Sequence, residues 1–396
     1  MSSRVFVAGV GMTRFQKPGQ SEAWDTMAVA AAHAAIADAG IDYADVQQAY
    51  IGFVYANTTS GQMVVYQLGL TGIPVFNVNN ACASGSTALF LARQAVQSGA
   101  VDVALAVGFE QMPAGPLSLP FNLPPSADFL AAIRDRLLPP EPGVPYAAQL
   151  FGGAGLEYQR SYGTEAATFA RVQVKARRHA AHNPLAMFTA PLTLEEVLES
   201  PRLFGPLTRY QACAPTCGAA AAVIVSESFA RRNALAGLVE IAAQCMTSDD
   251  ETIVTEPTLM NVVGCQMTRR AARAVYESTG VGPEDIQVVE LHDCFTVAEI
   301  VFAEALGLCE DGGAERMVID GDNTYGGRHV VNPSGGLLSK GHPLGATGLA
   351  QCHELVHQVR GTAGARQVDG ITHALQHNAG LIGTCVVTLY TCVDRT

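Results

Sequence analysis

The sequence has few charged residues, and most of its charges are negative. Charged residues make up 15% of the 396 residues, and the formal net charge is −12. Neutralising the phosphates of a nucleic acid needs clustered lysine and arginine over a basic surface, so the composition excludes a large nucleic-acid footprint. A small anionic ligand can still bind locally. With 48% hydrophobic residues, the chain also lacks the polar signature of disorder, and we expect a compact, ordered protein.

Long apolar runs and closely spaced cysteines are also missing. No run approaches the roughly 20 apolar residues needed to span a bilayer, so we expect no membrane span. The ten cysteines lack the regular dense spacing of a disulfide framework, and no apolar signal segment follows Met1. The last three residues, 394–396, are not a peroxisomal targeting tripeptide. We therefore expect reduced thiols and a cytoplasmic location.

Metal-site spacing is absent as well. Cys213 and Cys217 are the closest cysteine pair, but no second cysteine or histidine pair lies at the spacing of a zinc site. We interpret both as small core residues and expect no metal.

An internal duplication organises the chain. Residues 4–8 indicate a strand, 26–38 an alanine-rich helix and 49–54 a second strand, and the same order returns as a helix over 267–278 and a strand over 286–291. Seven identities share one offset of 240 residues, which is hard to obtain by chance. They pair Met27, Ala31, Ala32, Ala34, Gly40, Asp45 and Gln47 with Met267, Ala271, Ala272, Ala274, Gly280, Asp285 and Gln287.

The sequence therefore predicts an α/β protein of two similar halves, over residues 1–245 and 246–396. Residues 112–206 break the pattern of the first half, because they are rich in proline and carry amphipathic stretches such as 165–179. We interpret them as an inserted loop domain. The apolar run 218–225 then restores a buried strand.

Two similar turns carry candidate catalytic residues. Residues 79–87 contain Cys82 among small residues and lead into an apolar helix over 88–96. Backbone N–H groups at a helix start stabilise a thiolate, so Cys82 is a candidate nucleophile, although a buried cysteine is often inert packing. Residues 341–348 again precede an apolar helix. Their His342 can deprotonate a nearby thiol or be a satisfied turn histidine.

Two further segments hold polar side chains beside strands. Residues 291–295 (Leu-His-Asp-Cys-Phe) end the strand 286–291, and strand ends in open α/β sheets are where ligands bind. Histidine, aspartate and cysteine can ligate metals, but adjacent residues rarely reach one tetrahedral ion together. Residues 376–380 (Gln-His-Asn-Ala-Gly) enter the last apolar strand, over 384–390.

These four segments, in this order and at these separations, resemble the thiolase superfamily along essentially the whole chain. The branch they resemble most is the sterol carrier protein 2 type. Its marks are the His-Asp-Cys-Phe tetrad at 292–295, the glycine-rich run 332–348, and His377-Asn378 where most thiolases have a final catalytic cysteine. The resemblance implies a five-layered αβαβα fold with a loop domain over the active site, and a homodimer. It implies a 3-oxoacyl-CoA thiolase that uses coenzyme A as co-substrate and has no permanently bound cofactor.

The resemblance also implies residue roles. Cys82 would be the nucleophile with His342 as its base, and Cys294 would exchange protons with the enolate and with incoming CoA. His292 and His342 would donate hydrogen bonds to the thioester oxygen in one oxyanion hole. The backbone N–H groups of Cys82 and of the turn at Ala379 and Gly380 would form a second.

Three positions depart from this pattern or stay open. His377 is either a group that supports the site or a packing residue. Cys385 lies within a continuous apolar strand, so we expect it in the core and not in the place of the missing cysteine. Related sequences place Asp-Gly before the alanine run, where this chain has Cys217-Gly218.

The phosphates of CoA need a cationic partner, and the strongest local basic group lies in the predicted insertion. Its members are Arg171, Lys175, Arg177 and Arg178. A phosphate site and an ordinary solvated helix face both fit this pattern.

Three other functions are alternatives to the thiolase interpretation. A dinucleotide site is disfavoured because Gly9-Val10-Gly11 is followed by Arg14 where the third glycine belongs. A condensing or retro-aldol enzyme can use the same fold, but the presence of both Cys82 and Cys294 favours thiolysis. A non-catalytic acyl-CoA or lipid-binding protein needs no pair of thiols.

Overall fold

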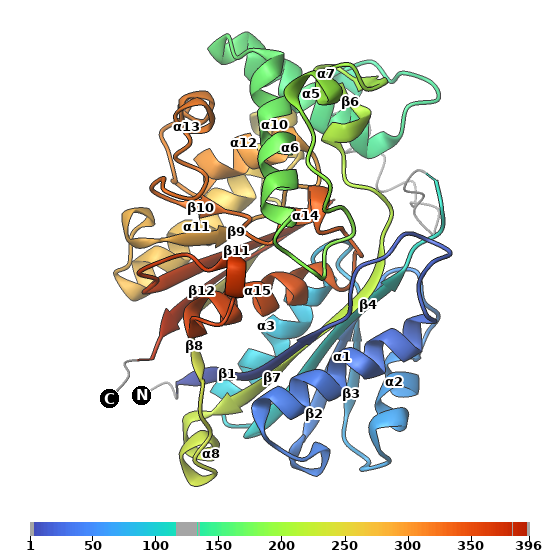
Figure 1. Ribbon diagram of the computed structural model, residues 1–396, viewed down its shortest axis with the longest axis vertical. Helices are drawn as coiled ribbons and strands as arrows, with labels where there is room; N and C mark the ends of the chain where they lie inside the picture. The colour runs from blue at the N-terminus through green and yellow to red at the C-terminus, as the bar shows by residue number, and fades with distance from the viewer. Residues whose placement is uncertain (1–3, 116–132, 134, 382, 394–396) are drawn as a thin grey trace.

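The computed structural model describes residues 4–115, 133, 135–381 and 383–393. Ten strands form one mixed sheet in the order β10-β9-β11-β12-β8-β1-β7-β4-β2-β3 (Figure 1). They are β1 (Val5–Met12), β2 (Gln48–Gly52), β3 (Val75–Val78), β4 (Val103–Gln111), β7 (Cys217–Ser226), β8 (Val239–Thr247), β9 (Val288–Glu290), β10 (Val330–Val331), β11 (His373–Gly380) and β12 (Thr384–Cys392). Every residue of β7 is buried, because helices cover both faces of the sheet.

The two halves of this sheet repeat the same strand order. The order β3-β2-β4-β7-β1 corresponds to β10-β9-β11-β12-β8, and in each half the first three strands pair in parallel while the other pairs are antiparallel. Helix α1 (Trp24–Ala39) corresponds to α11 (Cys265–Thr279), and each ends at a left-handed glycine, Gly40 or Gly280. The prediction of two similar halves is confirmed. At the centre, β1 and β8 pair antiparallel and join them.

Helices form three layers around the two halves of the sheet (Figure 1). Helices α1 and α2 (Ser60–Leu68) lie on the outer side of the first half, and α11 with α12 (Thr296–Ala305) on the outer side of the second. Helices α3 (Ser84–Gln97) and α15 (Thr347–Arg360) lie between the halves, and each contacts strands of both. One core cluster therefore combines Leu89 and Leu355 of these helices with strand residues of both halves. The predicted five-layered fold is confirmed.

The chain between β4 and β7 covers one end of this assembly (Figure 1). It contains α5 (Tyr146–Tyr162), α6 (Ala166–Ala180), α7 (Leu194–Leu198) and the hairpin of β5 (Arg202–Phe204) and β6 (Leu207–Thr208). Helix α6 packs on α12 and α14 (Gly336–Ser339), and α5 packs on α10 (Leu259–Val262). Further short helices are α8 (Glu227–Arg232), α9 (Thr252–Thr255) and α13 (Ala314–Asp320).

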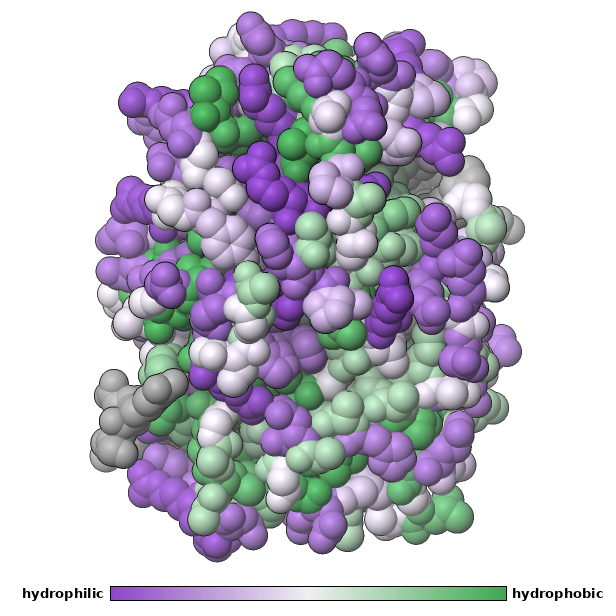
Figure 2. All heavy atoms as spheres, viewed as in Figure 1, coloured by the Kyte–Doolittle hydropathy of each residue, from purple (hydrophilic) through white to green (hydrophobic). Residues whose placement is uncertain are grey.

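Figure 2 shows hydrophilic and hydrophobic residues mixed over this face of the molecule, with pale green residues frequent over its lower half. Within the described ranges, no helix combines the length and the apolar character needed to cross a bilayer. All ten cysteines are free thiols.

Candidate active site

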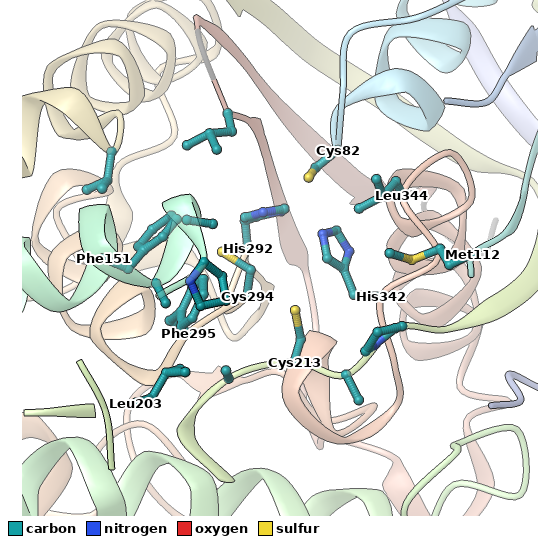
Figure 3. Close-up of a pocket in the computed structure, with 18 of the residues that line it drawn as sticks. Cys82, Met112, Phe151, Leu203, Cys213, His292, Cys294, Phe295, His342 and Leu344 are labelled. Atoms are coloured by element: carbon teal, nitrogen blue, oxygen red, sulfur yellow. The ribbon is translucent and has the colours of Figure 1, made fainter. Parts of the chain in front are cut away.

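A cavity of about 530 Å³ lies where the turns before α3, α12 and α15 face the covering helices. Cys82, His292, Cys294 and His342 all line it, although three separate segments of the sequence supply them (Figure 3). The rest of the lining is mostly apolar and includes Met112, Phe151, Leu203, Val263, Phe295, Leu344 and Leu381. The cavity thus combines four reactive side chains with a surface suited to a hydrocarbon chain.

Cys82 lies on a strained turn between β3 and α3. The preceding Ala81 has a φ of 48°, in the left-handed region that alanine rarely adopts. Ser84 holds this turn, because its Oγ donates to the carbonyl oxygen of Ala81 at 2.7 Å and accepts the N–H of Asn80 at 2.9 Å. The Cys82 side chain is 7% exposed and points into the cavity (Figure 3). The local backbone therefore fixes where the thiol is presented.

A hydrogen bond to Thr347 determines which ring nitrogen of His342 carries the proton. The hydroxyl of Thr347 donates to the carbonyl oxygen of Pro343 at 2.9 Å, so its oxygen is left to accept the hydrogen bond from Nδ1 of His342 at 2.7 Å. Nδ1 therefore carries the proton, and Nε2 carries the lone pair. Nε2 is buried and has no hydrogen-bond partner among the described residues. It is a base nitrogen free to act on a group in the cavity.

Residues 292–295 turn the chain from β9 into α12. His292 and Cys294 line the cavity, whereas Asp293 points away and accepts the backbone N–H of Leu337 at 2.7 Å. Nδ1 of His292 lies 3.0 Å from the amide nitrogen of Asn378. The rings of His292 and His342 are 5.1 Å apart and nearly perpendicular. One ligand atom each from Cys82, His292 and His342 lie within 4.8 Å of one another.

Burial keeps these groups uncharged. It raises the pKa of Cys82 to about 12, although the backbone N–H groups of Leu381 and of Cys82 itself act in the opposite direction. Burial also lowers the pKa of His342 to about 3 and the pKa of His292 well below its ordinary value, and it raises the pKa of Cys294. The helix start does not keep Cys82 ionised as the sequence suggested, because burial outweighs it. The resting site holds thiols and neutral imidazoles.

The thiolase N-terminal domain matches residues 5–228, and the thiolase C-terminal domain-like family matches residues 247–390. The chain belongs to the thiolase family. Its curated relatives include sterol carrier protein 2 from Bos taurus, 48% identical over 398 residues, which cover 98% of this chain and 72% of that protein. Non-specific lipid-transfer protein-like 2 from Caenorhabditis elegans is 42% identical over 399 residues, covering 98% and 96%. This thiolase is therefore of the sterol carrier protein 2 type.

Solved structures of thiolase relatives have the same fold. The Ltp2-ChsH2(DUF35) aldolase superposes with a TM-score of 0.84 at 26% identity, covering 99% of this chain and 98% of that one. Human mitochondrial 3-ketoacyl-CoA thiolase in complex with CoA superposes with a TM-score of 0.74 at 17% identity, covering 99% and 98%. The second likeness concerns the fold alone.

His377 and Cys385 both lie outside the cavity lining. Nδ1 of His377 accepts the backbone N–H of His292 at 3.4 Å, its Nε2 lies 3.0 Å from Oγ1 of Thr268, and its ring packs on Phe302. His377 thus both packs and supports the backbone of residues 292–295. Cys385 is fully buried in a core cluster of the second half, with its sulfur 3.7 Å from Oγ1 of Thr268.

The turn after β11 meets Cys82 and the cavity through several residues. Ala379 lines the cavity, but Gly380 packs against the backbone of Asn80, where a side chain would collide. The backbone N–H that acts on the sulfur of Cys82 belongs to Leu381. No motif marks Leu381, because a backbone donor leaves no signature in the residue type.

The four residues of the expected basic group lie in two different environments: two are buried and two are exposed. Lys175 is buried, forms an ion pair with Glu299 and donates to the carbonyl oxygen of Val331 at 3.2 Å. Arg177 is buried with its guanidinium 4.4 Å from the ring centroid of Phe188. As phosphate ligands these two residues are wrong, because internal partners already use their charges. Arg171 and Arg178 are exposed, and neither lines the cavity.

Two residues that line the cavity were missed. Cys213, expected in the core, packs against a core cluster, but it is partly exposed, lines the cavity and donates its backbone N–H to the carbonyl oxygen of Cys294 at 2.9 Å. Arg209 also lines the cavity, and its residue is exposed. Cys217, by contrast, is fully buried with its sulfur against the carbonyl oxygen of Met112, so the Cys217-Gly218 departure adds no group to the cavity.

Glu110 links the backbone at Val54 and Tyr55 with the backbone at Gly345. Its buried carboxyl accepts the backbone N–H groups of Val54 and Tyr55 at 3.0 Å and of Gly345 at 3.1 Å. Val54 and Leu344 belong to the apolar cluster around Cys82. Burial raises the pKa of Glu110 from 4.5 to about 7.

We predict that Glu110 stays protonated up to about neutral pH. Between pH 4.5 and about 7 the folded protein holds a proton here that the unfolded chain has lost. Raising the pH through this window therefore lowers the free energy of unfolding by up to about 3 kcal/mol at this residue. Infrared difference spectra between about pH 5 and pH 9 should show loss of one carboxylic acid band that Glu110→Gln lacks. A band with the same titration in that variant would contradict the assignment.

Proposed function

We propose that this protein is a 3-oxoacyl-CoA thiolase, an acyl-CoA C-acyltransferase of lipid degradation that works through an acyl-cysteine on Cys82. The observation that carries the proposal is the meeting of Cys82, His292, Cys294 and His342 on one apolar cavity. Thiolysis needs a nucleophile, a base with a free lone pair and a second proton-exchanging group. Simple binding of a lipid needs none of them.

The first half-reaction transfers an acyl group to the enzyme. Nε2 of His342 takes the proton of Cys82, and the thiolate attacks the 3-oxo carbon of the substrate. The bond between the second and third carbons breaks, and its electron pair forms the enolate of the departing CoA thioester. Nε2–H of the now protonated His342 and an N–H of His292 lie on the cavity to stabilise that enolate oxygen. Cys294 protonates the enolate carbon, which gives the shortened CoA thioester.

The second half-reaction releases the acyl group. The thiolate of Cys294 takes the proton of the incoming CoA thiol, and the CoA sulfur attacks the acyl carbon on Cys82. The tetrahedral intermediate collapses, Cys82 leaves as a thiolate, and it recovers its proton from His342. We assign the donors beside this oxyanion to the backbone N–H groups of Cys82 and of the turn at Ala379, Gly380 and Leu381. Each group returns to its neutral starting state.

The cavity also supports a substrate class and a place for CoA. Its phenylalanine, leucine, valine and methionine side chains favour a hydrocarbon acyl chain. Among the described lining residues, Arg209 is the one side chain that is permanently cationic, and we assign it to a CoA phosphate. We also retain Arg171 and Arg178 as candidates for the outer part of CoA, since both are exposed on α6.

The proposal also covers the division of the chain into domains and its cellular compartment. The repeated strand order supports two halves with an insertion near 112–206, but it places β8 (Val239–Thr247) in the second half, so we move the proposed boundary from residues 245–246 to the residues before Val239. Ten unpaired cysteines are typical of a reducing compartment and support the cytoplasm.

A retro-aldol reaction is the second candidate, and the likeness to the Ltp2-ChsH2(DUF35) aldolase favours it. Such a reaction breaks a carbon–carbon bond without an acyl-enzyme and without consuming CoA. The paired thiols Cys82 and Cys294 are therefore the feature that separates the two reactions.

Acylation of Cys82 tests the proposed function directly. We expect acetyl-CoA to leave one acetyl group on Cys82, detected by peptide mass spectrometry, and CoA-dependent cleavage of a 3-oxoacyl-CoA. Cys82→Ala should lose both and still fold, because alanine fits a turn of small residues. Cys213→Ala, from the same cavity, should keep the adduct. An adduct on Cys213, or cleavage that continues in Cys82→Ala without CoA, would disprove the thiolase assignment.

Cys294 and Cys385 form a matched pair for the second thiol. We expect Cys294→Ala to acquire an acyl group on Cys82 but to lose thiolytic turnover by about 10²- to 10⁴-fold, as is typical for one acid–base group. Cys385→Ala should lose only about 1 kcal/mol of packing energy and keep turnover. Single-turnover acylation and steady-state thiolysis, measured on both variants, distinguish the two roles. Active Cys294→Ala together with inactive Cys385→Ala would reverse the assignment.

We further propose a homodimer that forms through the edge of the sheet at β3. This strand ends the sheet, so one side of its backbone has no partner strand among the described residues. Exposed apolar side chains lie on and beside it: Met63, Tyr66, Leu70 and Phe76. Symmetric pairing of two such edges would bury these side chains and complete the hydrogen bonds of β3.

Charge at this edge should dissociate the dimer. We expect wild-type protein to have the mass of two chains in light scattering and Leu70→Glu/Phe76→Glu to have the mass of one. The control is Ile319→Glu on α13, where Ile319 is 60% exposed on a different part of the surface. A monomeric wild type, or dissociation by Ile319→Glu alone, would show that β3 is not the interface.

A further inference from the structure

Cys82, His292 and His342 present a set of atoms that metal ions favour. One thiol sulfur and two imidazole nitrogens lie within 4.8 Å of one another on a cavity wall. Zinc and cobalt bind such mixed sulfur and nitrogen ligands, whose atoms lie roughly 3.5 Å apart around a tetrahedral ion. A small inward movement of the side chains would therefore make a three-ligand site with one open position.

A metal needs a lone pair from every histidine, so the position of each ring proton decides whether an ion can bind. His342 meets this need, because its Nδ1–H is held by Thr347 and its Nε2 is free. His292 does not. The atom of Asn378 that faces its Nδ1 is the amide nitrogen, at 3.0 Å, and an amide nitrogen can only donate. With the amide in this orientation, Nδ1 of His292 is the acceptor and the proton is on Nε2.

The side chain of Asn378 is tightly confined. It is fully buried on β11, on the face that packs against the central helices, and a side chain at Gly348 would come within 2.7 Å of its Oδ1. That oxygen has no hydrogen-bond partner among the described residues. A buried polar atom without a partner destabilises the fold. An apolar residue would avoid this cost, so the amide is better explained by what it does to His292.

We propose that Asn378 is a positioning residue that keeps the proton of His292 on Nε2, so that His292 acts as a hydrogen-bond donor and the three side chains do not bind a metal ion. Thr347 and Asn378 then set opposite tautomers in two neutral imidazoles. His342 offers a lone pair, and His292 offers an N–H, to the same cavity. The donor part of this statement rests on the proposed thiolase function, whereas the metal part rests on geometry alone.

The lowered pKa values of both histidines support this division. Burial keeps His292 and His342 neutral, so a single proton on each ring determines its role. A protonated imidazole would donate through both nitrogens, and Asn378 would then face a donor with another donor.

Asn378→Asp tests the proposal by reversing the hydrogen bond. A carboxylate accepts from Nδ1–H, which leaves the lone pair on Nε2 of His292 and completes the metal ligands. Cobalt(II) titration, followed by the sulfur-to-cobalt absorption band, should show binding at least about 10- to 100-fold tighter than in wild type. The band should vanish in Asn378→Asp/Cys82→Ala. Equal cobalt affinity in wild type and folded Asn378→Asp would overturn the proposal.

A matched control is available on the same strand. Gln376 is also fully buried, two residues earlier on the same face, and its amide bonds to Ser86 and Gly348, not to a histidine. Gln376→Glu therefore buries the same kind of new carboxyl group without touching His292. Cobalt binding should stay as weak as in wild type. An equal gain in this variant would show that any buried carboxyl attracts the ion, and the proposal would fail.

A second measurement needs no change at Asn378. In wild-type protein labelled with ¹⁵N-histidine, the His292 signals, assigned by their loss in His292→Asn, should show a lone pair on Nδ1 and a proton on Nε2. The opposite tautomer would overturn the proposal. Turnover gives the remaining evidence: Asn378→Asp should lower kcat by about 10²- to 10³-fold with KM nearly unchanged. Absence of thiolysis in wild type, with the tautomer and cobalt results as expected, would refute the proposed function and leave the positioning role intact.

Discussion

The site depends on two helix starts that touch backbone to backbone. A side chain at Gly85 would come within 2.6 Å of the carbonyl oxygen of Gly345, and a side chain at Gly348 would overlap Ser86. These glycines let α3 and α15 begin against each other, between the two halves of the sheet. Because neither helix can shift without breaking this contact, the turns that precede them hold Cys82 and His342 on the same cavity. The chemistry follows from a packing constraint.

Apart from Arg209, the described residues that line the cavity carry no permanent charge, and the buried ion pairs lie outside the cavity lining. The reactive groups are neutral, whereas the loops of the second half are held by buried ion pairs of Lys340 with Glu290, at 3.1 Å, and of Arg366 with Glu354. Buried ion pairs contribute little net stability but define one arrangement strongly, since breaking one leaves an unpaired charge. The ion pair of Lys340 and Glu290 lies between the end of β9 and the turn before α15. It therefore fixes the relation of His292 to His342 without altering their protonation.

Repetition and motif order made much of this protein predictable from sequence. The offset that pairs Met27 with Met267 anticipates the repeated strand order, and the small residues around Cys82 anticipate a turn closely approached by other backbone. Partners that depend on three-dimensional neighbours were not predictable. Lys175 looks like a surface cation because Glu299 is distant in sequence, and Cys213 looks like core because the cavity it lines is built by other segments. Burial, which raises the pKa of Cys82, is likewise a property of the whole assembly.

The core shared by α3 and α15 also bears on how a duplicated chain like this one arose. Each central helix packs against strands of both halves, and β1 pairs with β8 across the seam. A single half would expose one whole face of its sheet and one central helix, apolar surface that a folded domain buries against another layer. The ancestral half is therefore best pictured as a symmetric pair of identical chains, already joined edge to edge before gene fusion. Fusion then released each copy to diverge, so that one kept a cysteine where the other kept a histidine.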